Sequence, residues 1–220
     1  MAINAIVFDI GGVLAHDVWE PLVFGEVNSI ATICNLDSKK TREVGQILWD
    51  EFAHRSANEE IGWQELELNY WEKFINKLKL QISTENLLAI TEQYIKPVPG
   101  MLELVRQLHS RGLKLALCSN NTEFWYERQN KKLGLEYFFP KNNVILSSRV
   151  GISKESPNFE MFKATINALE VNKLSCLFID DRQENIEIST RYGIPSILFP
   201  SHSQFGSQYL TNLLKEMKVI

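Results

Sequence analysis

Five short apolar runs recur along the chain, and stretches with helical periodicity separate them. The runs are rich in strand-favouring residues and span residues 4–8, 113–118, 143–146, 174–179 and 194–199. Apolar stripes at helical spacing lie between them, for example over residues 101–108 and 159–169. Because parallel strands need crossover connections, this alternation predicts a doubly wound α/β fold around a parallel sheet.

One long segment breaks the alternation. Residues 16–96 hold no strand pattern, only helical stripes such as the one over residues 71–78 and the one at Val44, Ile47 and Leu48. The segment ends at Pro97-Val98-Pro99-Gly100, a run of turn residues. We therefore predict an α/β core of residues 1–15 and 97–220, closed by a helix near residues 206–218, and an inserted all-helical domain of residues 16–96. The short connections suit a rigid-body hinge.

Composition limits the classes of partner. A chain of 220 residues with 45% hydrophobic content can bury one sizeable core, and its formal net charge of −4 gives no broad basic surface for nucleic acid or an anionic membrane. The cysteines, Cys34, Cys118 and Cys176, lack metal-type spacing, which favours buried thiols in a reducing compartment. Since the chain shows no basic leader and no long apolar run, we expect a cytoplasmic protein. Monomer and homodimer both stay open.

Polar side chains mark the ends of the predicted strands. Asp9 follows the first strand, Ser119-Asn120 the second, Lys154 comes after the third, and Asp180-Asp181 ends the fourth. Taken singly, each fits a turn, a helix cap or a solvated lysine. Ligands of open α/β sheets bind beyond the carboxyl ends of the strands, so the four together indicate one site.

The motifs around these residues carry a family resemblance. FDIGGV, LCSNN, the lysine of GISKESPNFEMF and FIDDRQEN resemble, in this order, the four motifs of the haloacid dehalogenase-like (HAD) hydrolase superfamily, and the helical insert resembles the cap of its helical-cap subclass. The resemblance implies a Rossmann-like core with an inserted all-helical cap domain. It also implies that Mg²⁺-dependent hydrolysis of phosphate esters is the commonest activity, with a minority of dehalogenases.

The chemistry of a phosphate ester accounts for these residue types. A carboxylate such as Asp9 can attack phosphorus and form an acyl phosphate, so we expect Asp9 to be the nucleophile. Because Asp9, Asp180 and Asp181 all repel a phosphate dianion, the site needs cations, which Mg²⁺ and Lys154 would supply. Lys154 would also orient Asp9.

The resemblance assigns roles to the remaining motif residues. It implies that Asp9 and Asp181 bind Mg²⁺ directly, that Asp180 is an accessory acid, and that the carbonyl of Gly11 is a further ligand. The hydroxyl of Ser119 and the amide of Asn120 would donate to the phosphate oxygens. We interpret Gly11 and Gly12 as backbone that approaches metal and phosphate with little room for a β-carbon. Asn185 is expected to brace the acidic loop.

Gly11 departs from the family pattern, because most phosphatases of the family carry there an aspartate that protonates the leaving oxygen. The D-x-G-x-V pattern is similar to that of bacterial phosphatases acting on sugar 1-phosphates, whose anomeric oxygen leaves more easily than a primary alkoxide. We therefore expect sugar 1-phosphates to react faster than 6-phosphates. His16 is the nearest candidate in sequence for a substrate contact or a replacement acid, although it also fits a solvated linker.

Two other functions stay open. One is a metal-independent haloacid dehalogenase, and the other is a catalytically weakened protein that binds or senses a metabolite. Most aromatic residues of the helical insert are expected to pack its helices, and one or two of them to face the substrate; these residues are Trp19, Trp49, Trp63, Trp71, Phe24, Phe52, Tyr70 and Phe74. Its charged residues Arg42, His54 and Arg55 fit solvated positions, although one of them could bind a carboxylate or hydroxyl of the substrate.

Overall fold

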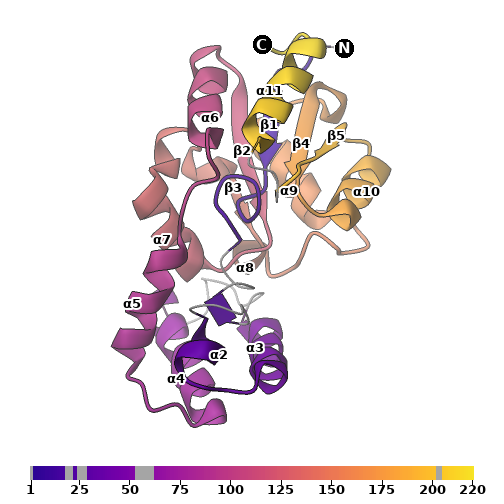
Figure 1. Ribbon diagram of the computed structural model, residues 1–220. Coiled ribbons are helices and arrows are strands. Elements are labelled where there is room, and N and C mark those ends of the chain that lie inside the picture. Colours follow the sequence, from indigo (N-terminus) through magenta and orange to yellow (C-terminus); the bar gives the residue numbers. More distant parts are fainter. Residues whose placement is uncertain (1, 18–21, 24–28, 53–61, 202–204) are drawn as a thin grey trace.

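The structure, a computed structural model, describes residues 2–17, 22–23, 29–52, 62–201 and 205–220 (Figure 1). Its strands are β1 (Ala5–Phe8), β2 (Lys114–Ser119), β3 (Val144–Leu146), β4 (Cys176–Asp180) and β5 (Ser196–Leu198). Its helices are α2 (Ile30–Ile33), α3 (Ser38–Phe52), α4 (Trp63–Leu78), α5 (Thr84–Tyr94), α6 (Met101–Ser110), α7 (Glu123–Leu133), α8 (Ser147–Val150), α9 (Glu160–Leu169), α10 (Gln183–Tyr192) and α11 (Gly206–Glu216). Each of the five predicted strands is confirmed, with ends that differ by a residue or two.

The five strands form one sheet in the order β3-β2-β1-β4-β5, and all neighbouring pairs are parallel. The chain winds outward from β1 through β2 to β3 and then returns to pair β4 on the other side of β1. The predicted doubly wound α/β fold is therefore confirmed. The change of direction beside β1 is the place where open α/β sheets bind ligands.

Alternating side chains of the strands build a separate core on each face of the sheet. On one face Ile6 and Phe8 of β1 pack with residues of α6 and α11, while on the other Ala5 and Val7 pack with residues of α9 and α10 (Figure 1). Burial on both faces explains why the strands have continuous apolar runs rather than alternation with polar residues. Cys118 and Cys176 lie buried in the second core as free thiols, as predicted.

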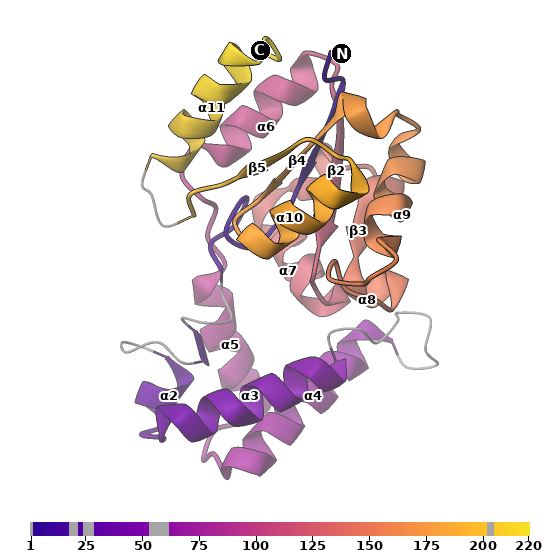
Figure 2. The ribbon, with the colours of Figure 1, turned by 90° about the vertical axis from the view of Figure 1, so that its right-hand side faces the viewer.

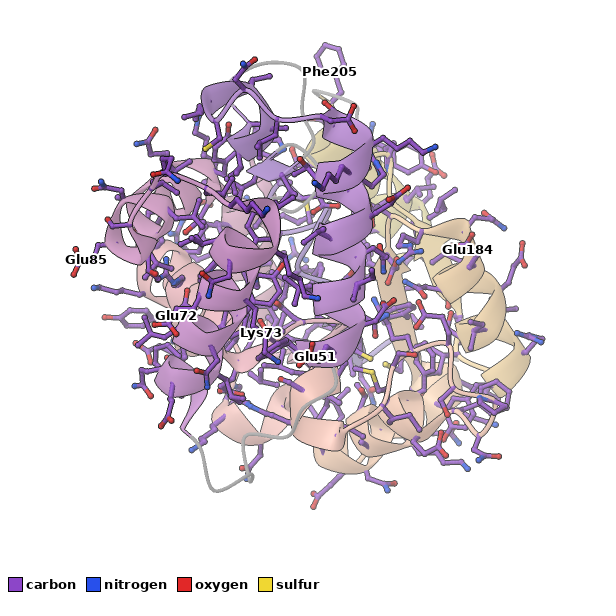
Figure 3. The ribbon with its side chains drawn as sticks, turned by 90° about the horizontal axis from the view of Figure 1, so that it is seen from below. Glu51, Glu72, Lys73, Glu85, Glu184 and Phe205 are labelled. Atoms are coloured by element: carbon purple, nitrogen blue, oxygen red, sulfur yellow. The ribbon has the colours of Figure 1, made fainter. Side chains whose placement is uncertain are left out.

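The described residues between 16 and 96 form helices and no strand, as the sequence predicts. They lie beyond the carboxyl ends of the strands, with α3 and α4 beside each other (Figure 2). Leu48 of α3 and Trp71 of α4 belong to the insert's own hydrophobic cluster, and Glu51 and Lys73 form an ion pair on its surface (Figure 3). The domain limits at residues 16 and 96 stay a prediction.

Ile47 was expected in the apolar stripe of α3 but is 58% exposed. The buried residues of this helix are Thr41, Gly45, Leu48 and Phe52, so its inner face runs along the i, i+4, i+7 line from Thr41. Ile47 lies one position off this line, and the expectation was wrong for that side chain.

Among the described residues, no helix has both the length and the apolar character needed to cross a bilayer.

The insert rests on α7, a helix of the core. Phe124 and Trp125 of α7 pack in the insert's hydrophobic cluster, where the Trp125 ring lies 6.4 Å from the Trp71 ring, edge to face. One turn further on, Arg128 pairs with Glu67 of α4 at 2.9 Å and donates to the Thr91 hydroxyl of α5 at 3.1 Å. These contacts lie only a few residues after Ser119, so the helix that positions the insert begins next to the predicted site.

Candidate active site

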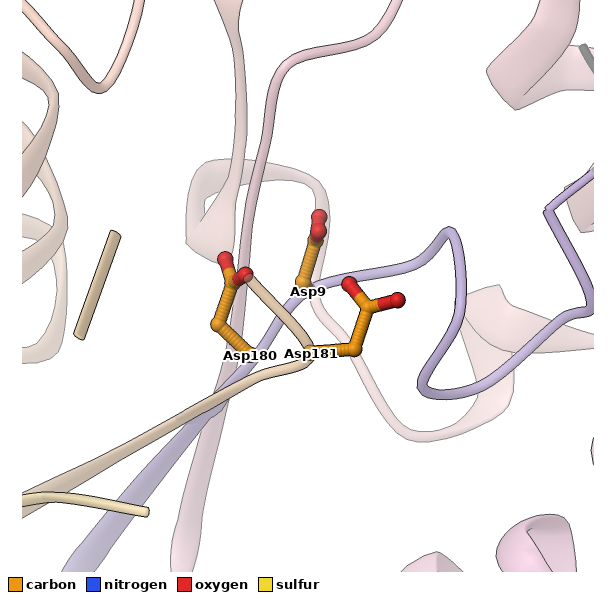
Figure 4. Close-up of side chains that lie close together, drawn as sticks. All are labelled: Asp9, Asp180 and Asp181. Atoms are coloured by element: carbon orange, nitrogen blue, oxygen red, sulfur yellow. The ribbon is translucent and has the colours of Figure 1, made fainter. Parts of the chain in front are cut away.

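Three aspartates from two strand ends meet beside β1 (Figure 4). Asp9 follows β1, Asp180 is the last residue of β4, and Asp181 comes next. One carboxylate oxygen from each lies within 4.8 Å of the others. Because β1 and β4 are parallel neighbours, their carboxyl ends bring these residues to one edge. Ser119 ends β2 on the other side of β1.

Lys154 reaches this edge from the loop between α8 and α9. Its ammonium lies 3.1 Å from Asp9 Oδ2 and 2.5 Å from Asp180 Oδ2, and its side chain is only 1% exposed. Burial by itself would lower the pKa of Lys154, but the two carboxylates outweigh burial and raise it above the ordinary value. Lys154 therefore holds a permanent positive charge against Asp9.

Asp9 is buried, and its carboxylate is fixed from two sides. The Ile10 N–H donates to Oδ1 at 2.8 Å, while Lys154 lies against Oδ2. Burial raises the pKa of Asp9 to about 7; Lys154 and a hydrogen bond from Ser119 oppose the rise, whereas Asp180 and Asp181 add to it. A cation bound at this edge would favour the carboxylate form that a nucleophile needs.

Asp180 is fully buried, and protein donors surround its carboxylate. Besides Lys154, the Arg182 N–H donates at 2.8 Å, and the Asn185 amide donates to both oxygens at 3.0 Å. The predicted bracing of the acidic loop by Asn185 is therefore seen directly. Asp180 orients Lys154 and the loop, and it is not among the residues that line the cavity described below.

Asp9 and Asp181 do line that cavity, so a metal ion bound in the cavity would meet these two carboxylates of the cluster. Burial raises the pKa of Asp181, and Asp180 adds to the rise, while a hydrogen bond with Ser201 and the charge of Lys154 oppose it. Mg²⁺ commonly uses one or two carboxylates with water and phosphate oxygen, and this donor set fits it. The Gly11 backbone lines the same cavity, and its role as a ligand stays a prediction.

The two glycines of the first motif differ. Gly12 has a φ of +71°, and a β-carbon there would lie 2.0 Å from Asp181 Oδ2. A side chain at Gly12 would therefore displace Asp181. At Gly11 a β-carbon would meet no protein atom within 4 Å, so the expected lack of room beside metal and phosphate stays a prediction there. The surrounding protein atoms therefore give no steric reason for a glycine at position 11.

Asn120 joins two loops of the site. Its side-chain amide donates to both carboxylate oxygens of Glu155, at 3.0 and 2.9 Å, and its Oδ1 accepts from the Lys154 N–H at 2.9 Å. The side-chain amide thus fixes the Lys154 loop, while its predicted donation to phosphate stays a prediction. Sequence reasoning missed Glu155, although it adjoins the motif lysine.

A cavity of about 660 Å³ opens in front of these residues, within the usual size of small-molecule sites. Asp9, Ser119, Asn120, Lys154 and Asp181 lie on its core side. Its other walls include residues that sequence reasoning did not assign, from the first connection, from α3, and from α7 and the loop before it: Asp17, Gln46, Asp50, Asn121, Trp125 and Gln129.

Among the candidate contacts of the insert that the structure describes, Trp49 lines this cavity. The other described candidates do not line it: Arg42, Phe52, Trp63, Tyr70, Trp71 and Phe74. His16 is exposed and absent from the lining, and its backbone N–H donates to the Lys96 carbonyl at 2.9 Å, so it joins the two connections of the insert. Four further candidates, Trp19, Phe24, His54 and Arg55, lie outside the described residues.

The fold and this edge together define an enzyme of the doubly wound α/β class, with acidic and basic groups gathered at the switch point of its sheet. The family model of the haloacid dehalogenase-like hydrolases matches residues 3–189. The chain belongs to this family of hydrolases.

Two curated relatives match at low identity. Mouse acyl-CoA dehydrogenase family member 10 is 25% identical over 194 residues, which cover 88% of this chain but 18% of that protein. Pyrophosphatase PpaX of Halalkalibacterium halodurans is 25% identical over 95 residues, 43% of this chain and 42% of that protein. The matches thus span less than half the length of either relative.

Solved structures share the fold at lower identity. A HAD family enzyme of Bacteroides thetaiotaomicron, bt-2542, was solved with magnesium and inorganic phosphate. It is 18% identical, with a TM-score of 0.65 over 92% of this chain and 96% of that one. The L-2-haloacid dehalogenase RSc1362 is 19% identical, with a TM-score of 0.59 over 91% of this chain and 87% of that one. Both likenesses show the fold alone.

Proposed function

We propose that the protein is a Mg²⁺-dependent phosphatase of small phosphorylated metabolites, that Asp9 is its nucleophile, and that sugar 1-phosphates are among its substrates. The observation that carries the proposal is that the three aspartates differ in their surroundings. Protein donors surround Asp180, whereas Asp9 and Asp181 face one cavity with Lys154 beside them. Two carboxylates with an adjacent cation suit a metal-bound phosphate.

In the first step a carboxylate oxygen of Asp9 attacks phosphorus. The new bond joins Asp9 to the phosphoryl group and the bond from phosphorus to the alcohol oxygen breaks. The electron pair of that bond stays on the alcohol oxygen, which takes a proton from solvent water. Ser119 and Lys154 line the cavity next to Asp9 and would donate to the phosphoryl oxygens as charge builds up there. Magnesium held by Asp9 and Asp181 would offset the charge of the phosphate.

In the second step water attacks the aspartyl phosphate, which releases inorganic phosphate and restores Asp9. Lys154 keeps its position in both steps because Asp180, held by Asn185 and the Arg182 N–H, fixes the ammonium from behind. With Gly11 in place of an aspartate, no carboxylic acid at that position assists the leaving oxygen. Alcohols that leave easily should therefore react best, which favours anomeric phosphates.

The test is phosphate release by wild-type protein and by Asp9→Asn, with Mg²⁺ and with chelator. We expect metal-dependent turnover in the wild type and a loss of at least about 10³-fold in Asp9→Asn, because the amide is not a nucleophile. Glu72→Gln, an exposed carboxylate on α4, is the matched control and should keep full activity. Undiminished turnover by Asp9→Asn, with its fold verified by circular dichroism, would refute the role of Asp9.

The same assay separates the two alternatives. A dehalogenase would release halide from 2-haloacids in the presence of chelator, since Asp9 can displace halide from carbon without metal. A protein that only binds metabolites would show binding of esters by calorimetry but would hydrolyse none of them, even at high protein concentration. The cavity-facing Asp181 favours the phosphatase, because displacement of halide has no need of a second carboxylate.

A further inference from the structure

The cavity continues from the aspartates to a wall that the proposed chemistry does not use. Gln46, Trp49 and Asp50 of α3 and Trp125 of α7 form part of this wall. The helix α3 lies beyond the carboxyl ends of the strands (Figure 2). In an in-line displacement the leaving oxygen lies opposite the attacking oxygen, so the alcohol part of an ester points away from Asp9. The wall is therefore placed to contact the alcohol part.

The described lining carries an excess of negative charge. Its carboxylates belong to Asp9, Asp17, Asp50, Glu155 and Asp181, and its cations are Lys154 and Arg182. Asp9 and Asp181 are committed to the reaction, which leaves Asp17, Asp50 and Glu155 to face the rest of a substrate.

The two cations offset only part of the charge of these five carboxylates. Lys154 is buried against Asp9 and Asp180. Arg182 is 57% exposed and lies 3.9 Å from Glu155 and 3.5 Å from Glu184. Burial would raise the pKa of Glu155, but hydrogen bonds from Ser153 and Asn120 outweigh it and lower the pKa, so Glu155 stays charged.

The polar groups of the wall can form hydrogen bonds with hydroxyl groups of a substrate, and its aromatic rings can contact carbon-bound hydrogens. The amide of Gln46 donates to Asp50 Oδ1 at 2.8 Å, and the amide of Asn121 donates to Gln129 Oε1 at 2.8 Å. Each of these pairs holds a polar group in a fixed place, and carboxylates accept hydrogen bonds from hydroxyls. Trp49 and Trp125 add flat apolar surface beside them.

From this arrangement we infer, on the basis of the proposed function, that the substrates are phosphate esters of uncharged polyhydroxylated alcohols and that the cavity rejects esters with a second anionic group. Asp50 and its neighbours repel a carboxylate or a second phosphate on the alcohol part. By this argument, inorganic pyrophosphate, whose leaving group is itself a phosphate, is a poor substrate.

A matched substrate pair tests the inference. Glucose 1-phosphate and glucuronic acid 1-phosphate share the same anomeric leaving oxygen and differ in a carboxylate at the far end of the ring. For the wild type at low salt we expect kcat/KM for glucose 1-phosphate to exceed that for glucuronic acid 1-phosphate by about tenfold or more, and the ratio should fall as salt is added.

The variant Asp50→Asn removes one charge of the wall and keeps its size. We expect the ratio to fall by about threefold, the size of one partly screened charge. Glu43→Gln is the control, since it removes the same charge from α3 at an exposed position outside the cavity. The control should leave the ratio unchanged.

The outcomes separate this inference from the proposed function. A wild-type ratio near one, or a preference for the anionic ester or pyrophosphate, overturns the charge selection and leaves the phosphatase standing. An absence of turnover of every ester refutes the phosphatase. In that case, calorimetric binding of the two sugar esters decides the charge selection separately, and equal affinities would overturn it.

Discussion

Gly11 gives the sharpest test of how the leaving oxygen is released. The perturbation is Gly11→Asp, which restores the acid that most phosphatases of the family carry. The position accepts it sterically, because a β-carbon there meets no atom within 4 Å, and Gly11 lines the cavity. The substitution should therefore add a carboxylic acid to the site without forcing other side chains to move.

The expected magnitude depends on the leaving group. General acid catalysis typically contributes on the order of 10²–10⁴ in rate, and a factor of about 100 corresponds to about 2.7 kcal/mol of barrier. A primary alkoxide needs this help more than an anomeric oxygen. We expect kcat for glucose 6-phosphate to rise by about 10- to 100-fold and kcat for glucose 1-phosphate by only a few-fold. KM should rise for both, since the new carboxylate repels phosphate.

The assay compares glucose 1-phosphate, glucose 6-phosphate and 4-nitrophenyl phosphate in the wild type, Gly11→Asp and Gly11→Asn. The asparagine has the same size but cannot transfer a proton, so it should leave kcat for the 6-phosphate low. The aryl ester has a good leaving group and should gain little from the aspartate. Two results would refute the reasoning: a wild-type preference for 6-phosphates, or equal gains from aspartate and asparagine.

Three further predictions concern other parts of the site and its support. Gly12→Ala should destabilise the protein by about 2 kcal/mol and abolish metal-dependent turnover, because φ is +71° and the methyl group would collide with Asp181; urea denaturation and phosphate release measure both effects. Since the pKa of Asp9 is raised to about 7, binding of Mg²⁺ below pH 7 should release a proton and weaken up to about tenfold for each pH unit lowered, which calorimetry in buffers of different ionisation enthalpy would detect; pH-independent binding from pH 5 to 7 would contradict it. Burial raises the pKa of Glu67 in spite of Arg128, so the pair itself adds little; Glu67→Gln should still cost about 1–2 kcal/mol in thermal unfolding because Arg128 loses its nearest carboxylate, and an unchanged melting temperature would count against this.

The sequence predicted the fold and the core side of the site for one physical reason. Buried parallel strands appear as apolar runs, and their carboxyl ends share an edge, so polar residues at those ends must come together. Asp9, Ser119 and Asp180 needed no other information. The role of Asn185 could also be predicted, because an amide five residues after Asp180, on the following helix, can reach back to that carboxylate.

The rest of the site depends on how helices pack against the core. Gln46 and Asp50 line the cavity because α3 lies beyond the strand ends, and no local pattern specifies that placement. Even the buried face of α3 was predicted wrongly at one residue, because Ile47 was expected to be buried and is exposed. At Gly11, sequence alone cannot tell a glycine that lacks room for a side chain from one with open space beside it, because only the surrounding atoms differ.

The position of α7 has a consequence for how this protein can evolve. Trp125 belongs to the wall of the cavity and also packs against Trp71 inside the insert. A substitution that adapts the wall to another alcohol therefore also changes the packing that keeps the insert folded. Substrate range and stability are then coupled traits at this residue. New specificities should arise more readily at Gln46 and Asp50, which are exposed and carry none of the insert's apolar packing.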